Sequence, residues 1–304
     1  LSLNIPVLLS CSLQVTGANK GIGNGIVELL ARGLKPTSEW HVYLTARNEK
    51  LGLEAVKVLE EKGLSVKFHQ LDITDAESRH RLAAFIKENY AEGIDILVNN
   101  AGIAYKVDST APFGEQAKVT IFLPLMAKDS RLVNVASTMA IMSLHAEAGD
   151  HEKAGFSNSA YGMSKVGLWK ATAILAEQFR GDPRHILINS CCPGYVNTDM
   201  SSHKGHKTIL EGTFALKWPL NVIIVIDRYS NLQLAKVKVS VELFASHSTK
   251  LNYRRIILLM LIPRVLLGAD TPVYLATLPK GATEPYGQFV RERCVVDVDK
   301  ECPL

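Results

Sequence analysis

The sequence contains few of the features that mark secreted or metal-binding proteins. Its 304 residues include only five cysteines, and no pair of them has the C-x-x-C spacing that is typical of a metal site. No N-x-Ser/Thr glycosylation sequon is present. Both absences favour the reducing cytosol over the secretory route, so we predict a cytoplasmic protein without a bound metal.

Long apolar runs are missing as well. The longest run in the second half of the chain, residues 256–262, stops at Pro263, well short of the roughly 20 residues that span a bilayer. The apolar residues 1–13 have no positively charged residue before them and lead straight into a glycine-rich loop, which leaves no room for a signal-peptide cleavage site. We therefore predict neither a membrane partner nor a secretory signal.

A uniformly basic surface is also absent. The formal net charge is +4, but residues 213–267 hold eight Lys or Arg and two Asp or Glu, a local charge of +6. The rest of the chain together carries −2. Because the basic excess is confined to one segment, we do not expect a nucleic-acid partner.

The composition, 47% hydrophobic and 21% charged, is that of an ordinary globular protein with a sizeable core. Strand-like and helix-like segments alternate, which predicts an α/β fold with a doubly wound parallel sheet. The expected strands are residues 12–16, 41–46, 66–71, 94–99, 131–136, 186–191 and 288–293. Four helices are expected. The first follows the first strand and ends near Arg32, and the second covers residues 51–62 with a C-cap at Gly63. The third begins at Thr74 with the capping pattern Thr74-x-x-Glu77, and the fourth covers residues 159–179.

Three regions do not fit this repeat. Gln14 lies in a strand that should be buried on both faces, where an apolar residue is expected. Residues 100–131 leave room for only a short fourth helix, which Pro124 interrupts late in its course. Residues 213–267 are rich in Val, Ile and Leu without a clear period. We interpret them as an atypical insertion in a single domain that covers residues 1–304.

A glycine-rich loop follows the first expected strand. The pattern Gly17-x-x-x-Gly21-x-Gly23 opens a helix, and the backbone N–H groups of such a loop and helix N-terminus can hold a dinucleotide pyrophosphate. Glycine is needed there because a Cβ would block the approach of the backbone to the phosphate. The alternative is a glycine-rich turn without a ligand, which the strand–loop–helix context disfavours.

The end of the second expected strand indicates which dinucleotide binds. An acidic residue there would accept the ribose 2′-hydroxyl of NAD, whereas an arginine accommodates a 2′-phosphate. This chain has Arg47 after the strand and Lys20 inside the glycine loop, with no Asp or Glu at the strand end. Two cations and no carboxylate predict NADPH; the alternative is that both are solvated surface charges.

Tyr161 and Lys165 are four residues apart on an expected helix, so their side chains share one face. A phenol has a pKa of about 10, and a nearby ammonium would lower it toward the range of a general acid–base group. Ser137, just after the fifth expected strand, would polarise a substrate carbonyl oxygen. Each residue also has a plain interpretation, as a surface pair or a turn serine, and their joint occurrence is what favours a site.

Two other patterns give competing hypotheses. The adjacent Cys191 and Cys192 could form a redox site, but buried strand cysteines are more often inert. Ser137 with His145 and an aspartate could form a hydrolase triad, but the G-x-S-x-G turn of such enzymes is missing. The dinucleotide interpretation is the stronger one.

These motifs, in this order, resemble those of the short-chain dehydrogenase/reductase superfamily. The matching elements are the glycine loop, the N-N-A-G sequence at residues 99–102, Ser137 and Tyr161-x-x-x-Lys165. Within the superfamily, residues 13–207 and 268–293 resemble the NADPH-dependent carbonyl reductases. The resemblance implies a Rossmann-type fold and the reduction of aldehydes, ketones and quinones to alcohols by hydride transfer from NADPH. Small-molecule carbonyl compounds would be its partners, and a monomer is favoured.

The resemblance also implies roles for individual residues. Tyr161 would donate the proton, Lys165 would bind the nicotinamide ribose, and Ser137 would hold the carbonyl oxygen. Residues 99–102 would line the nicotinamide pocket, unless they are a simple strand terminus, and the backbone after the sixth strand would contact the nicotinamide carboxamide. The implied cofactor contacts are Gly17, Asn19, Lys20, Gly21, Ile22, Gly23, Arg47, Leu71, Asp72, Asn99, Tyr161, Lys165, Val196, Asn197 and Thr198. The implied substrate contacts are Ser137, Ala104, Tyr105 and Lys106.

Three departures from the family bear on activity. The family's fourth helix carries an asparagine that anchors a proton-relay water, whereas this chain runs from Ile121 straight into the apolar residues 122–125, so we expect the adjacent sheet face to be thinly covered. Ser137 and Tyr161 are closer together than in monomeric carbonyl reductases. Residues 213–267 replace a very short connection. The alternative hypothesis is therefore a catalytically impaired NADP-binding fold, such as a mis-spliced product.

Overall fold

The computed structural model describes residues 10–102, 121–141, 149, 153, 160–209 and 268–298. These residues belong to one unit, formed by Leu1–Glu211 and Arg264–Leu304. The expected insertion at residues 213–267 lies outside the described residues, as do the expected substrate contacts Ala104, Tyr105 and Lys106. The insertion and its boundaries therefore stay a prediction.

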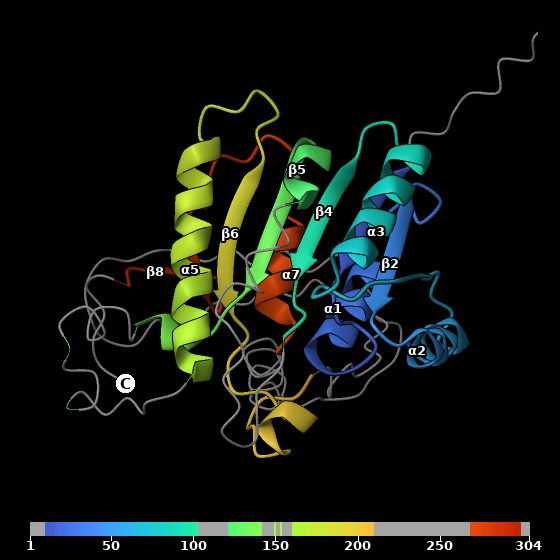
Figure 1. Ribbon diagram of the computed structural model, residues 1–304. Helices are drawn as coiled ribbons and strands as arrows, with labels where there is room; N and C mark the ends of the chain where they lie inside the picture. The colour runs from blue at the N-terminus through green and yellow to red at the C-terminus, as the bar shows by residue number, and fades with distance from the viewer. Residues whose placement is uncertain are drawn as a thin grey trace, which may run out of the picture. The chain divides into compact units, whose positions relative to one another are not determined.

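An eight-stranded sheet forms the centre of this unit, in the order β3-β2-β1-β4-β5-β6-β7-β8 (Figure 1). Neighbouring strands are parallel from β3 to β7, and β8 pairs antiparallel with β7. The chain runs outward from β1 to β3 and then crosses back to β4, which confirms the doubly wound fold of the Rossmann type. The strands are β1 Cys11–Val15, β2 Trp40–Ala46, β3 Lys67–Gln70, β4 Ile94–Asn99, β5 Met126–Val135, β6 Leu187–Cys192, β7 Phe289–Arg291 and β8 Cys294–Val296.

The described helices connect these strands. They are α1 Gly21–Gly33, α2 Glu49–Glu61, α3 Ala76–Asn89, α5 Ala160–Phe179 and α7 Asp270–Ala276, with short 3-10 segments at Thr138–Ile141 and Asp199–Ser201. Each expected strand and each of the four expected helices is present, with ends shifted by a few residues, whereas α7 and β8 were not expected. Gly63 follows the last residue of α2 by two positions and has the positive φ, +77°, that a helix-ending glycine takes.

The start of α3 differs from the expected one. Asp75 is the N-cap, and its carboxylate accepts hydrogen bonds from the backbone N–H groups of Glu77 at 3.0 Å and Ser78 at 3.1 Å. Thr74 instead donates its hydroxyl to Asp72 at 2.7 Å. The predicted capping pattern of Thr74 and Glu77 is therefore wrong, because a carboxylate one residue later takes the open N–H groups of the first turn.

Two apolar clusters pack on opposite faces of the sheet. One cluster gathers α1, α2 and α7, with Ile26, Leu59 and Leu275 among its buried side chains. The other gathers α3 and the second half of α5, with Leu82 and Ala176 among its buried side chains. Figure 1 shows α3 and α5 in front of the sheet and α7 behind it. With both faces covered, the strand ends are the natural place for a binding site.

Residues 121–125 cover part of the sheet face that we expected to be thinly covered. Residues 121–125 form a 3-10 segment, in which Phe122 and Leu123 are 0% and 5% exposed. Both belong to the cluster around α3, and β5 then begins at Met126, earlier than expected. Pro124 is tolerated because such a short segment needs no continuous helical hydrogen bonding. These residues expose little apolar surface, but residues 103–120 lie outside the described part of the chain, so the thin cover expected beside the nicotinamide pocket stays a prediction.

Gln14 occupies the buried position in β1 where an apolar side chain was expected. Its Nε2 donates to the Ser12 hydroxyl at 3.2 Å, but its Oε1 has no hydrogen-bond partner among the described residues. An unpaired buried polar atom costs about 1–3 kcal/mol. We expect the double variant Ser12→Ala/Gln14→Met, measured by urea denaturation, to be more stable than the parent by about 1 kcal/mol.

The matched control is Gln70→Met. The Oε1 of Gln70 accepts a hydrogen bond from the Ser78 hydroxyl at 2.9 Å, so its removal should lower the stability. A double variant at Ser12 and Gln14 that is less stable than the parent would contradict this account of Gln14.

Candidate active site

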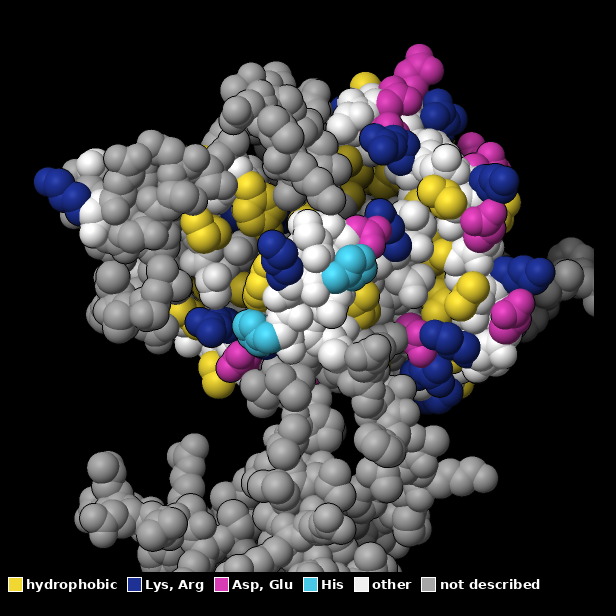
Figure 2. All heavy atoms as spheres, turned by 90° about the horizontal axis from the view of Figure 1, so that it is seen from below, with side chains coloured by type: hydrophobic (Ala, Val, Ile, Leu, Met, Phe, Trp, Pro, Cys, Tyr) yellow, Lys and Arg dark blue, Asp and Glu magenta, His cyan; other side chains and the backbone are white. Residues whose placement is uncertain are grey.

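The expected site residues converge at one edge of the sheet, where β1, β4, β5 and β6 end. The strands are in register there, pairing Val15 with Val98, Asn99 with Asn134, and Val135 with Cys191. The glycine loop, residues 99–102 and Ser137 follow these strand ends directly. Figure 2 views this edge, where acidic, basic and histidine side chains lie together. In open α/β sheets, this edge at the switch point is where ligands bind.

The glycine loop is held by the side chain of Asn100. Its Nδ2 donates to the backbone oxygens of Thr16 and Gly17 at 3.0 and 3.2 Å. A Cβ at Gly23 would lie 2.4 Å from that nitrogen, and a Cβ at Gly17 would lie 2.8 Å from the Cα of Ala101. Neither glycine can therefore be enlarged without moving residues 99–102, which brace the loop.

The start of α1 fits a bound phosphate group. Gly21 has a φ of +61°, and a Cβ there would find its nearest described neighbour, the Thr198 side chain, at 3.7 Å. Lys20 is the N-cap of α1, with extended backbone and no side-chain cap hydrogen bond. The first N–H groups of a helix have no intrahelical partner, so an anion can bind at this end of α1.

The two cations expected at the 2′-phosphate have different surroundings. The Nζ of Lys20 lies 2.6 Å from Asp199, which also lies 3.3 Å from the imidazole of His203. Arg47 is exposed just after β2. The carboxyl of Asp72 is buried enough to raise its pKa, but the hydrogen bonds from Thr74 and the charge of Arg47 outweigh this and lower it. The sequence did not predict that Lys20 is paired with Asp199.

Ser137, Tyr161 and Lys165 are brought together beside β5 and β6. The Nζ of Lys165 lies 5.7 Å from the centre of the Tyr161 ring, one helical turn away on α5. The Ser137 hydroxyl is near enough to the phenol of Tyr161 to act on its pKa. Ser137 Oγ also accepts the backbone N–H of Met139 at 3.3 Å, which fixes it at the start of the 3-10 segment. The expected grouping of these three side chains is therefore present.

The electrostatics of this group differ from the expectation. Burial raises the pKa of Tyr161, and the neighbouring Cys192 raises it further, against the hydrogen bond from Ser137. Burial also lowers the pKa of Lys165 to about 8, and its Nζ donates to the Val135 carbonyl at 3.0 Å. In the protein alone, the pKa of the phenol therefore shifts in the direction opposite to the one expected from Lys165, because burial is the largest cause.

A series of side-chain hydrogen bonds, which the sequence did not predict, runs from the strand ends into α5. Asn99 Nδ2 donates to Asn134 Oδ1 at 2.8 Å, and Asn134 Nδ2 donates to Thr172 Oγ1 at 2.9 Å. The Oδ1 of Asn99 is buried without a hydrogen-bond partner among the described residues. Asn134 in a strand buried on both faces was the available signal, since a buried amide needs partners.

The segment after β6 closes the other side of the site. Val196 is buried, and Thr198 and Ser201 form a reciprocal capping box that fixes the turn at Asp199–Ser201. The Sγ of Cys192 accepts backbone N–H groups from Thr138 and Gly194, each at 3.2 Å. Cys192 therefore ties this segment to the one that carries Ser137.

The other candidate sites have less support in the structure. Cys191 is fully buried, which raises its pKa far above the usual range and makes it a packing residue. Across the described ranges, no three His, Cys, Asp or Glu side chains are grouped as metal ligands would be, and none of the described helices is long and apolar enough to cross a membrane.

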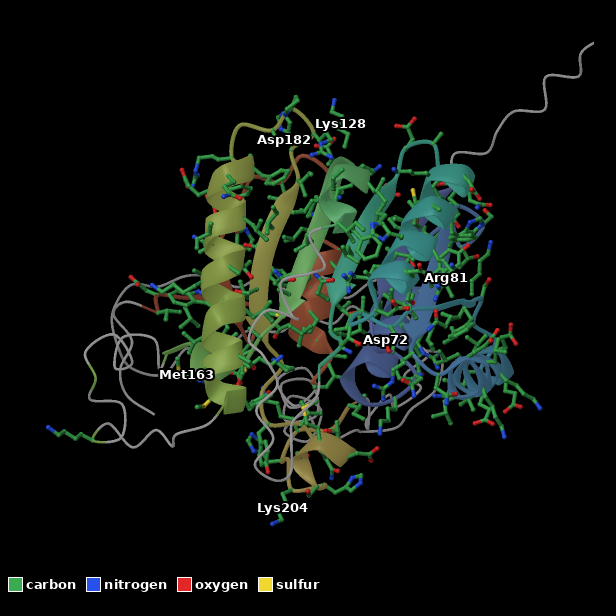
Figure 3. All side chains as sticks on the ribbon, in the orientation of Figure 1. Asp72, Arg81, Lys128, Met163, Asp182 and Lys204 are labelled. Carbon is green, nitrogen blue, oxygen red and sulfur yellow. The ribbon has the colours of Figure 1, made fainter. Side chains whose placement is uncertain are left out.

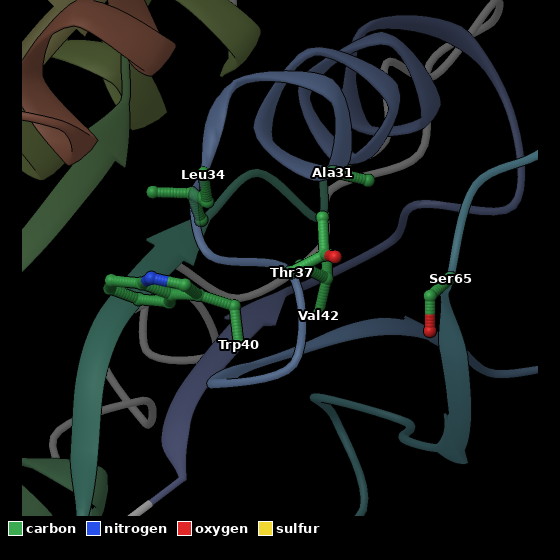
Figure 4. A pocket seen from close by; sticks show the side chains of 6 residues that line it. All are labelled: Ala31, Leu34, Thr37, Trp40, Val42 and Ser65. Carbon is green, nitrogen blue, oxygen red and sulfur yellow. The ribbon is translucent and has the colours of Figure 1, made fainter.

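His145, the histidine of the alternative hydrolase triad, lies outside the described residues. The hollow in Figure 4, lined by Leu34 and Trp40 among others, lies at the start of β2, at the opposite edge of the sheet.

Comparisons with known proteins agree with this geometry. Carbonyl reductase (NADPH) 3 of Rattus norvegicus is 34% identical over 94% of this chain and 98% of its own length. Carbonyl reductase (NADPH) 1 of Homo sapiens is 34% identical over 92% of this chain and 96% of its own length. Salutaridine reductase from Papaver somniferum, a solved structure, is 27% identical, with a TM-score of 0.51 over 66% of this chain and 91% of its own.

The landomycin C-6 ketoreductase structure is 19% identical, with a TM-score of 0.56 over 94% of this chain and 95% of its own, and it supports the fold alone. A family model described as short chain dehydrogenase matches residues 13–208. Because this match spans more than half of the chain and includes the glycine loop and the Tyr161–Lys165 pair, the protein belongs to the short-chain dehydrogenase family.

Proposed function

We propose that this protein is an oxidoreductase that reduces aldehydes, ketones or quinones to alcohols with NADPH. The observation that carries the proposal is the grouping of Ser137, Tyr161 and Lys165 beside the braced glycine loop. The relatives named as NADPH carbonyl reductases support the same activity. We also propose a cytoplasmic location, on the cysteine and sequon grounds given above, and a monomer, on the resemblance to the carbonyl reductases.

The cofactor would lie across the carboxyl edge of the sheet. The residues that would hold it are those of the glycine loop, together with Arg47, Asp72, Asn99 and the backbone of residues 196–198. The buried and unpaired Oδ1 of Asn99 is one acceptor available to a ligand there. When bound, NADPH supplies a hydride to the carbonyl carbon.

Three side chains would bind the substrate carbonyl, donate the proton and bind the cofactor ribose. Ser137 holds the substrate carbonyl oxygen, and Tyr161 donates its phenolic proton to that oxygen as negative charge develops on it. The raised pKa of Tyr161 keeps the phenol protonated, which is the form that reduction consumes. Lys165, buried beside Tyr161, binds the nicotinamide ribose and places a positive charge near the developing oxyanion.

Turnover measurements test the proposal directly. With an aromatic aldehyde and a quinone as substrates, the full chain should oxidise NADPH faster than NADH at equal concentrations. Cofactor binding without any turnover would favour the impaired alternative raised by the sequence, and failure to bind NADPH would contradict both.

Arg47→Asp should change the cofactor preference. A carboxylate at the end of β2 repels a 2′-phosphate and can accept the 2′-hydroxyl of NADH. We expect the ratio of the NADPH to the NADH dissociation constant to rise by at least ~10-fold, the equivalent of about 1.4 kcal/mol. Lys128→Asp is the control, because Lys128 lies at the opposite edge of the sheet (Figure 3). Equal constants for both cofactors in the parent protein would contradict the assignment.

Lys165→Met should raise stability at neutral pH while turnover is lost. Burial lowers the pKa of Lys165 from 10.5 to about 8, so between these values the unfolded chain binds more protons than the folded one and the parent gains stability as pH rises. Methionine removes this penalty but leaves the Val135 carbonyl unpaired, so we expect a gain of about 1–2 kcal/mol at pH 7. In urea denaturation the gain should shrink toward pH 10; a gain that grows with pH would contradict the account.

A further inference from the structure

Lys207, in the segment after β6, has almost no exposed surface. The residue is 7% exposed, and its Nζ donates to Glu292 Oε1 at 2.9 Å. Lysines are rarely buried to this extent unless they are paired, since an isolated ammonium is costly to remove from water. The hydrogen bond from Lys207 lowers the pKa of Glu292, so the two side chains form an ion pair at neutral pH.

The rest of Lys207 lies against the backbone that the site uses. A Cβ at Gly194 would come within 2.6–2.8 Å of the Cδ, Cε and Nζ of Lys207, so its side chain runs directly over that glycine. Its backbone N–H donates to Tyr195 at 3.0 Å, and its carbonyl accepts from the Asn197 N–H at 2.7 Å, which makes a parallel bridge with Val196. One residue thus contacts four consecutive residues of the segment.

Glu292 connects this arrangement to the sheet. It follows β7 directly, at the turn into β8, and has a φ of +52°. Since β7 is hydrogen-bonded to β6, the ion pair joins residues 194–197 to a rigid element on the far side of β6. A residue whose own side chain is locked by burial and by a second ion can hold a neighbouring backbone in place.

We propose that Lys207 is a positioning residue for the nicotinamide end of the cofactor, acting through the backbone of residues 194–198. The inference rests on the proposed function, in which this backbone faces the nicotinamide carboxamide. Lys207 touches neither cofactor nor substrate in this scheme. It fixes the place of the groups that do, and the adenosine end, bound at the glycine loop and Arg47, does not depend on it.

The test compares two ligands that differ in the nicotinamide end. NADPH carries it, whereas adenosine 2′,5′-bisphosphate carries only the adenosine end with its 2′-phosphate. For Lys207→Met in the full chain, we expect the NADPH dissociation constant to rise ~10-fold, as for the loss of one well-placed hydrogen bond. The constant for the bisphosphate should stay within about twofold. Glu292→Gln, which keeps the shape of the side chain, should shift NADPH binding in the same direction by a smaller factor.

Arg184→Met is the matched control. Arg184 is also in an ion pair, 2.7 Å from Asp182, and Figure 3 shows Asp182 at the opposite edge of the sheet. This variant should lose stability without a change in the ratio of the two dissociation constants. The melting temperature of each variant is measured beside the binding.

The outcomes separate the possibilities. Equal weakening of both ligands by Lys207→Met would show a purely structural role and overturn the inference, as would no change for either ligand. If Lys207→Met does not fold, the ratio measured for Glu292→Gln decides in the same way. Failure of the parent protein to bind NADPH would instead overturn the proposed function itself.

Discussion

Replacing Tyr161 by phenylalanine should lower kcat by at least ~10²-fold, the low end for removal of a general acid, while the dissociation constant for NADPH stays within about twofold. The substitution removes only the hydroxyl and leaves the ring beside Lys165 in place. Single-turnover reduction of a quinone, with cofactor binding measured by fluorescence, separates the two quantities.

Tyr286→Phe is the matched control for this prediction. Tyr286 lies before β7, outside the proposed site, and its hydroxyl donates to the Ala176 carbonyl in the second half of α5 at 2.6 Å. Its loss should leave kcat nearly unchanged. Near-normal turnover in Tyr161→Phe would place the proton donor elsewhere.

Phe122→Ala should lower the free energy of unfolding by about 3–5 kcal/mol, since a fully buried aromatic ring leaves a cavity that its neighbours fill only in part. Phe122 is 0% exposed and packs in the cluster with Leu82, Ile86 and Leu97. A loss of this size would show that residues 121–125 cover the sheet although the family's longer fourth helix has no counterpart in the sequence.

Leu53→Ala serves as the control for Phe122→Ala. Leu53 on α2 is 50% exposed, so its truncation should cost no more than ~1 kcal/mol. Urea denaturation of both variants, with the slope of the transition compared, measures the difference. If Phe122→Ala costs no more than Leu53→Ala, the 3-10 segment does not contribute to the core as the structure indicates.

Much of the site could be predicted because its signals are local. The spacing of Tyr161 and Lys165 determines a shared helix face, and the glycine loop has the strand–loop–helix setting of a phosphate site. Parallel strands bring their carboxyl ends to one edge, so the order of the expected strands was enough to place residues 99–102 and Ser137 beside the loop. The start of α3 was missed for an equally local reason, since Thr74 and Asp75 are both cap residues and spacing does not choose between them.

Contacts between distant segments could not be predicted in this way. Lys20 and Asp199 are 179 residues apart, and Lys207 and Glu292 are 85 residues apart. Charge and residue type indicate that such side chains can form ion pairs. Which of them do so depends on how β6 and β7 are placed in the sheet. The side-chain hydrogen bonds from Asn99 through Asn134 to Thr172 could not be predicted for the same reason, because they link two strands and a helix.

The sequence by itself determined the fold class, the edge of the sheet that carries the candidate site and the identity of the residues grouped there, since periodicity and short spacings encode all three. Tertiary structure alone decided the direction of the pKa shifts in that group. Burial raises the pKa of Tyr161 and lowers that of Lys165 to about 8, and the degree of burial depends on every element packed around α5, β5 and β6. Desolvation is a property of the assembled core, which is why the neighbouring ammonium, visible in the sequence, gave the wrong direction for the phenol.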